Sequence, residues 1–240
     1  MPEESRNSKT EPPDEGPDQP ISRGSSDGIP SLTGVILAGG QSRRYGTNKA
    51  LEKLDGIPLI EHACMSLKKA VSQVVISTNE PEIYEFLGLP MFRDQVKGLG
   101  PLSGIHAALR FIRGEAGFFV ACDMPFLNPS LIRHMAECCR DADAVVPRIG
   151  PYVEPLHSLY KKTCRPSVDH AVARREKKIV SFFGEIKVHY VEESMIRRYD
   201  PEMETFVNIN NPEEFRKAVA RRRAGPHSAR PSEAHEQDKG

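Results

Sequence analysis

The chain has 240 residues, with 33 basic and 33 acidic side chains, 38% hydrophobic residues and 7% aromatic residues. This composition is typical of a globular protein that can bury a substantial core, and no apolar run is long enough to cross a bilayer. A net charge of zero gives no long-range attraction for nucleic acid or an anionic membrane, so we expect neither as a partner.

The beginning of the chain differs in composition from the other residues. Residues 1–31 contain six prolines and seven acidic side chains and very few apolar groups. Such a segment cannot bury enough apolar surface to offset the entropy lost on ordering. We therefore expect a disordered N-terminal tail at residues 1–31.

From residue 32 to residue 220, short β-rich runs alternate with helical patterns, which predicts one α/β domain. Most of the β-rich runs are continuous and apolar, as in strands buried on both faces of a mostly parallel sheet. The expected strands are Thr33–Ala38, Gln73–Ser77, Met91–Arg93, Gly117–Cys122, Ala144–Pro147, Leu156–Tyr160 and Lys187–Val191. The expected helices are Leu59–Ala70, Pro81–Leu87, Leu102–Ile112, Pro129–Cys139 and Pro212–Arg222.

Residues 221–240 begin with three arginines and continue as a polar stretch that contains proline and glycine. Basic side chains suit the C-terminal end of a helix, so we expect a solvated helix end followed by a disordered tail. Binding of nucleic acid or lipid by these arginines is the alternative.

The cysteines indicate a reducing compartment. Their number is odd, and no pair has the C-x-x-C spacing, so they predict neither a disulfide framework nor a zinc site. The N-terminal residues also lack the apolar stretch of a secretory signal. We therefore expect a cytoplasmic protein with reduced thiols at Cys64, Cys122, Cys138, Cys139 and Cys164.

The segment Leu37–Lys49 begins at the end of the first expected strand and combines glycines with cations. In an open parallel sheet, ligands bind at the carboxyl ends of the strands. The glycines allow the backbone to approach a ligand, and Arg43, Arg44 and Lys49 can neutralise a polyphosphate. The spacing excludes a Walker loop, because Thr47 rather than a lysine follows the last glycine, and no G-x-G-x-x-G is present. The segment predicts a nucleotide-phosphate site.

Asp123 directly follows the buried run of the fourth expected strand, so its carboxylate should project at the same edge. Mg²⁺ takes one or two protein carboxylates and completes its coordination with substrate phosphates. Capping of the next helix is the competing role, but Asn128 is better placed for it. We therefore predict that Asp123 binds Mg²⁺.

Two further segments could contact a ligand. Residues Asp94–Gly104 form a second glycine-rich loop that leads into a helix. This loop could bind the base or the ribose of a nucleotide, or it could simply connect a strand to a helix. Near residue 210, alternation places Asn208 and Asn210 on one face of a short strand. Two amides can hold a polar heterocycle or a phosphate, although asparagine is also common in turns.

Four motifs follow one another along the chain: Leu37-Ala38-Gly39-Gly40-x-Ser42-x-Arg44-x-Gly46-x-x-Lys49, Gly100-Pro101-Leu102-x-Gly104, Cys122-Asp123-Met124-Pro125 and Phe206-x-Asn208-x-Asn210-x-Pro212. Together they resemble the molybdenum cofactor guanylyltransferase family over about residues 33–218. The resemblance implies a Rossmann-like three-layer sandwich with a mostly parallel central sheet. It also implies transfer of GMP from GTP to molybdopterin carrying molybdenum, with release of pyrophosphate.

The resemblance implies a role for each matching residue. Arg44, Lys49 and Asp123 would be catalytic, with Asp123 binding Mg²⁺. The residues implied to bind GTP or the pterin are Leu37, Ala38, Gly39, Gly40, Ser42, Lys49, Asn79, Asp94, Gly100, Pro101, Leu102, Asp123, Asn208 and Asn210, the last two on the pterin side. Asn48 stands where the family commonly has an aspartate, and Asn79 matches the family pattern only loosely.

Other functions remain open at this point. The acceptor could be a sugar 1-phosphate, or the nucleotide could be CTP. A non-catalytic module that binds guanine nucleotides or the cofactor is a further alternative, although such a module would not need both cations and the carboxylate. Apo-molybdoenzymes or their chaperones are candidate partners.

Overall fold

The computed structural model describes residues 31–39 and 48–209. The expected helix Pro212–Arg222, most of the N-terminal tail, the C-terminal tail and residues 40–47 lie outside this description. In the part of the chain that is described, no helix is long and apolar enough to span a membrane.

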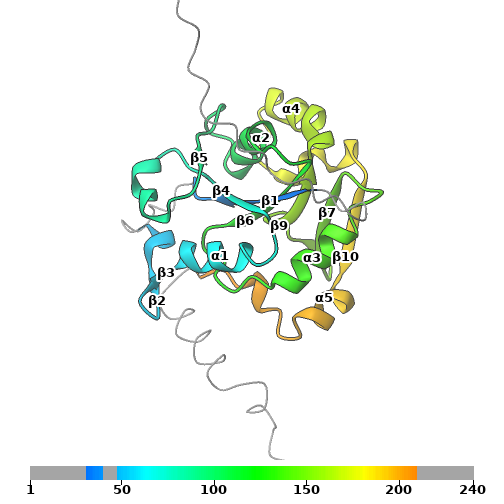
Figure 1. Ribbon diagram of the computed structural model, residues 1–240. Coiled ribbons are helices and arrows are strands. Elements are labelled where there is room, and N and C mark those ends of the chain that lie inside the picture. The colour runs from blue at the N-terminus through cyan, green and yellow to red at the C-terminus, as the bar shows by residue number, and fades with distance from the viewer. Residues whose placement is uncertain (1–30, 40–47, 210–240) are drawn as a thin grey trace, which may run out of the picture.

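A twisted central sheet runs through the domain (Figure 1). Seven of its strands lie side by side in the order β10-β7-β9-β6-β1-β4-β5, and the short β8 pairs with β7. Their bounds are β1 Leu32–Leu37, β4 Gln73–Ser77, β5 Met91–Phe92, β6 Ala116–Ala121, β7 Ala144–Ile149, β8 Tyr152–Val153, β9 His157–Lys161 and β10 Val188–Glu192. The prediction of a mostly parallel sheet is confirmed.

β9 runs against its two neighbours. It pairs antiparallel with β6 and with β7, whereas β1 pairs parallel with both β4 and β6. The other expected strands appear within two residues of their predicted bounds. The sequence pattern carried no signal for the direction of β9, because an apolar run is compatible with either orientation.

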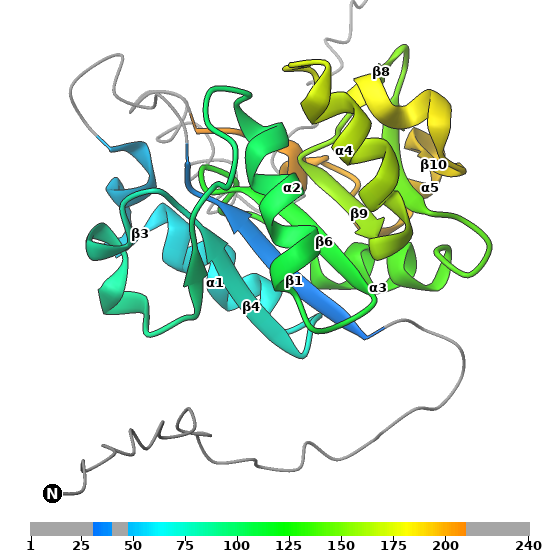
Figure 2. The same ribbon diagram turned by 90° about the horizontal axis from the view of Figure 1, so that it is seen from above.

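Helices cover both faces of the sheet, which makes the three layers visible in Figures 1 and 2. On one face, α1, α3 and α5 pack against a cluster that includes Ile36 and Phe118. On the other face, α2 and α4 pack against a second cluster that includes Val35 and Phe119. The helices are α1 Leu59–Leu67, α2 Pro101–Phe111, α3 Pro129–Glu137, α4 Arg165–Ala173 and α5 Glu193–Tyr199. Adjacent strand residues thus serve opposite cores, as the period of two requires.

Several elements differ from the sequence prediction. The expected helix Pro81–Leu87 is two 3₁₀ turns, η3 Pro81–Ile83 and η4 Glu85–Leu87. The second turn ends at Gly88, whose φ of 59° places it in the left-handed region that glycine adopts without strain. The helices α4 and α5 and the small hairpin of β2 (Lys53–Leu54) and β3 (Ile57–Pro58) had not been predicted.

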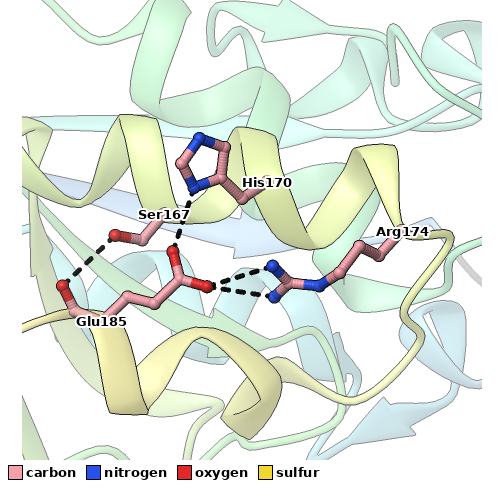
Figure 3. A network of polar contacts seen from close by, with 4 residues as sticks. All are labelled: Ser167, His170, Arg174 and Glu185. Carbon is pink, nitrogen blue, oxygen red and sulfur yellow. Dashed lines mark hydrogen bonds and ion pairs between the residues drawn. The ribbon is translucent and has the colours of Figure 1, made fainter.

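A 3₁₀ segment, η6 (Ile179–Glu185), is attached to α4 by a polar network (Figure 3). The Glu185 carboxylate pairs with His170 Nδ1 at 3.1 Å and accepts two 3.1 Å hydrogen bonds from the Arg174 guanidinium. Its backbone carbonyl accepts from Ser167 Oγ. These bonds from His170 and Arg174 hold the pKa of Glu185 below its usual range. All of these charged groups are exposed, so we expect the network to fix orientation more than to add stability.

Candidate functional site

The carboxyl ends of four parallel strands form one edge of the sheet. The backbone hydrogen bonds continue past the strands, from Ala38 N–H to the Ser77 carbonyl and from Thr78 N–H to the Phe92 carbonyl, both at 2.9 Å. The residues that follow β1, β4, β5 and β6 are therefore held in register with one another. Most of the described residues singled out from the sequence lie in these connections.

Gly39, Asn79 and Asp94 lie together at this edge. Asn79 Nδ2 donates to Asp94 Oδ2 at 3.0 Å, and the Asp94 backbone N–H donates back to Asn79 Oδ1 at 3.2 Å. A side chain added at Gly39 would begin 3.9 Å from both Asn79 Nδ2 and Asp94 Oδ2. Ser77 Oγ also donates to Asp94 Oδ1, at 3.4 Å. This arrangement presents a fixed carboxylate and amide beside a stretch of backbone that carries no side chain.

The second glycine-rich loop ends where α2 begins. Gly100 precedes the helix with φ of 60° and ψ of −140°, and Pro101 occupies its first turn. Leu102 is fully buried, so its side chain is part of the core. Leu37 is also a core residue, with 8% of its surface exposed. Gly104 allows the close approach of helix and sheet, because a methyl group there would lie 2.8 Å from Leu37 Cδ2.

Lys49 begins a short 3₁₀ turn, η2 (Lys49–Leu51), at the other side of this edge. Asn48 caps that turn, with Oδ1 accepting from the Ala50 N–H at 3.2 Å. The Asn48 amide also donates to the Tyr84 hydroxyl at 3.0 Å, which links η2 to the turn between η3 and η4. The asparagine at this position thus has a structural role that fixes the backbone next to Lys49.

Asp123 lies just beyond β6 and is half-buried. Burial raises the pKa of its carboxyl, while a backbone hydrogen bond and the positive charge of Lys49 lower it. A half-buried carboxylate beside one cation can bind a divalent cation, which would also favour its ionised form. The helix after Asp123 is capped by Asn128, whose Oδ1 accepts from the Ser130 and Leu131 N–H groups. The prediction that Asn128 rather than Asp123 caps α3 is confirmed.

Asn208 lies next to this loop. The backbone N–H of Ile209 donates to the Asp123 carbonyl at 3.1 Å. Asn208 is exposed, whereas Ile209 is fully buried and packs with Leu54, Leu59 and Phe126. The expected alternation is therefore present over these residues, although they form an irregular segment rather than the short strand that the sequence predicted.

Five of the residues that the sequence singled out, Gly40, Ser42, Arg43, Arg44 and Asn210, lie outside the described residues. Their roles stay predictions. Among residues 31–39 and 48–209, no group of three or more His, Cys, Asp or Glu side chains could hold a metal ion. A cation at Asp123 would need further ligands from substrate, which is the coordination that Mg²⁺ favours.

Sequence reasoning missed some residues at this edge. Arg175 follows α4 with a φ of 59°, and its Nη2 lies 3.9 Å from where a side chain on Gly98 would begin. An arginine within a run of basic residues gave no signal of this proximity. His106 is a core residue, because it is 7% exposed and lies against Asp169 of α4. His157 is fully buried and pairs with Thr205, so it contacts no ligand directly.

Comparisons with known proteins agree with this geometry. The model of the MobA-like NTP transferase domain matches residues 34–189. A probable molybdenum cofactor guanylyltransferase of Pelotomaculum thermopropionicum is 39% identical over 186 residues, covering 78% of this chain and 91% of the relative. The molybdenum cofactor guanylyltransferase of Syntrophotalea carbinolica is 31% identical, with 80% and 91% covered. The crystal structure of molybdopterin-guanine dinucleotide biosynthesis protein A from Archaeoglobus fulgidus superposes with a TM-score of 0.68 at 29% identity, covering 78% of this chain and 96% of that one.

Proposed function

Because this chain belongs to the MobA-like NTP transferase family, we propose that it transfers GMP from GTP to molybdopterin carrying molybdenum. The products are the molybdopterin guanine dinucleotide cofactor and pyrophosphate. The observation that carries the proposal is the position of Asp123 at the carboxyl end of β6, between the charge of Lys49 and the backbone of the segment that bears Asn208. A carboxylate under the influence of a cation thus lies at one edge of the sheet, next to the segment that bears Asn208.

The reaction needs alignment of two phosphates more than it needs a proton acceptor. An oxygen of the acceptor's phosphate monoester attacks the α-phosphorus of GTP, and the bond from that phosphorus to the β-phosphate oxygen breaks. The second pKa of a phosphate monoester is about 6, so the attacking oxygen is ionised at neutral pH without a general base. Lys49 and Arg44 stabilise the charge that develops on the triphosphate, and in-line positioning supplies the rest.

Mg²⁺ is the cation that we assign to Asp123. The single half-buried carboxylate fits an ion whose remaining ligands are substrate phosphates and water. When bound, the ion would neutralise charge on the triphosphate. The chain itself holds the Asp123 carboxylate in place through the hydrogen bond from the Ile209 N–H to the Asp123 carbonyl.

In this proposal the nucleotide lies against one half of the edge, which is formed by the residues that follow β1, β4 and β5. The backbone of Leu37, Ala38, Gly39 and Gly40 and that of Gly100, Pro101 and Leu102 contact the base, and Ser42 contributes to the same site. Asp94, fixed by Asn79, accepts hydrogen bonds from the nucleotide. On the other half, Asn208 and Asn210 face the pterin. The exposure of Asn208 beside the Asp123 backbone supports this division.

We place the reaction in the cytoplasm, with apo-molybdoenzymes or their chaperones as recipients of the product. All five cysteines are free, which suits a reducing compartment.

Pyrophosphate release measured with GTP, Mg²⁺ and a panel of acceptors tests the proposal. The panel contains molybdopterin carrying molybdenum, a sugar 1-phosphate and no acceptor. We expect release with the molybdopterin alone, and we expect Asp123→Asn to reduce it below about a tenth of the wild-type rate. Release with the sugar phosphate would assign a different acceptor, and GTP binding without release in any arm would identify a binding module.

A further inference from the structure

Two segments that are distant in the sequence run side by side in opposite directions. We call residues 123–128 the Asp123 loop and residues 205–209 the Asn208 segment. At one end, Ile209 N–H donates to the Asp123 carbonyl at 3.1 Å. At the other end, Asn128 N–H donates to Thr205 Oγ1 at 3.1 Å. The loop with the candidate metal ligand is therefore attached at both ends to the segment that bears Asn208.

Thr205 is the point at which the Asn208 segment is fixed to the rest of the fold. Its side chain is fully buried. Its backbone N–H donates to Asp200 Oδ2 at 2.7 Å, and its hydroxyl lies 2.8 Å from Nε2 of His157. The hydroxyl thus joins the Asp123 loop, the Asn208 segment and strand β9 through one oxygen atom.

His157 holds that hydroxyl from the sheet. It is the first residue of β9 and is fully buried. Its ring lies edge-on to Phe118 of β6 at 5.1 Å and tilted against Phe206 of the Asn208 segment at 4.8 Å. Burial lowers the pKa of the ring to about 4, so it is neutral at physiological pH and its pairing with Thr205 does not vary there.

Packing alone does not require this polar group. A valine would fill the space of Thr205 and would avoid the free-energy cost of burying a hydroxyl. A hydrogen-bonded hydroxyl, in contrast, allows only one arrangement of its partners. Asn128, whose N–H donates to the Thr205 hydroxyl, is also the residue that caps α3. Its side-chain amide donates to the Tyr199 carbonyl at 2.8 Å. The network therefore specifies the distance between the two segments.

We propose that Thr205 and His157 are positioning residues, which set the Asn208 segment against the Asp123 loop so that the acceptor phosphate meets the α-phosphorus of GTP. This inference rests on the proposed function. Neither residue touches the nucleotide, so their effect appears in acceptor use and turnover while GTP binding is retained.

Thr205→Val tests the inference, with Thr205→Ser as the matched control that keeps the hydroxyl. In Thr205→Val we expect the KM for molybdopterin to rise or kcat to fall by about tenfold. The Kd for GTP with Mg²⁺, measured by titration calorimetry, should stay within about twofold of wild type. Thr205→Ser should restore most of the lost activity.

Hydrogen exchange at the Ile209 amide gives a readout that does not depend on catalysis. Thr205→Val should exchange faster there than wild type and Thr205→Ser, because one end of the Asn208 segment is released. If Thr205→Val does not fold, His157→Leu removes the same contact from the other side and is judged by the same measurements.

Three outcomes would overturn the inference. One is wild-type kinetics in a folded Thr205→Val protein, another is an unchanged Ile209 exchange rate, and the third is equal loss of GTP affinity and acceptor use. Failure of the proposed function looks different, because the wild-type protein itself would then form no product from GTP and molybdopterin.

Discussion

Replacing Gly104 with alanine should crowd the contact between α2 and the ends of β1 and β4. The added methyl group would lie 2.8 Å from Leu37 Cδ2 and 3.0 Å from Ser77 Oγ, and both of these side chains are buried. Overpacking of this kind costs about 1–3 kcal/mol. Alanine recovers about 1 kcal/mol of helix propensity over glycine. The crowding is larger, so we expect a net loss of about 1 kcal/mol and a fall in Tm of about 2–4 °C.

The same substitution should reach the nucleotide site, because Ser77 Oγ donates to Asp94 Oδ1. We expect the KM for GTP to rise in Gly104→Ala. Differential scanning calorimetry and steady-state kinetics measure the two effects. Gly184→Ala is the control, since a methyl group there meets no atom within 4 Å. A Gly104→Ala protein with a higher Tm than wild type and an unchanged KM would refute this reasoning.

Three other predictions concern charge, pH and the N-terminal tail. Lys49→Ala, like Arg44→Ala, should lower kcat by roughly 10²-fold with a smaller effect on pterin binding; loss of pterin binding alone would assign these cations to the wrong substrate. In the folded protein the buried His157 stays unprotonated down to a pH of about 4, whereas in the unfolded chain it binds a proton below a pH of about 6.5. The free energy of unfolding should therefore fall by about 3 kcal/mol as the pH is lowered from about 6.5 to about 4. Urea denaturation of wild type and His157→Gln should show this loss only in the wild type. Deleting residues 1–30 should leave Tm and activity nearly unchanged, and a drop of several degrees would show that the tail packs on the domain.

The strands and the chemistry at their ends were predictable because both are local in the sequence. Apolar runs such as Gln73–Ser77 report burial on both faces, and that strand has the predicted bounds. A carboxylate or glycine directly after such a run must lie at the edge of the sheet. The positions of Asp94 and Asp123 at that edge therefore follow from the pattern alone.

The remaining features depend on tertiary contacts that the pattern does not contain. The segment Pro81–Leu87 has a proline followed by acidic and apolar residues, which indicates a helix, yet Tyr84 turns inward to meet Asn48 and the helix does not form. Helix α4 was missed because Pro166 and a polar sequence weaken its periodicity. Thr205 gave no signal, because threonine is common in turns and its partners lie 48 and 77 residues away.

The choice of nucleotide tests guanylyl transfer most directly. A site that bonds guanine through buried backbone groups should reject cytosine, because the wrong base leaves polar groups unpaired at about 1–3 kcal/mol each. The measurement is kcat/KM for GTP and for CTP with molybdopterin as acceptor, with the product identified by its mass, in wild type and in Gly40→Ala. We predict a guanine dinucleotide, a strong preference for GTP, and a greater loss with GTP than with CTP in Gly40→Ala. A wild-type protein that prefers CTP would contradict guanylyl transfer.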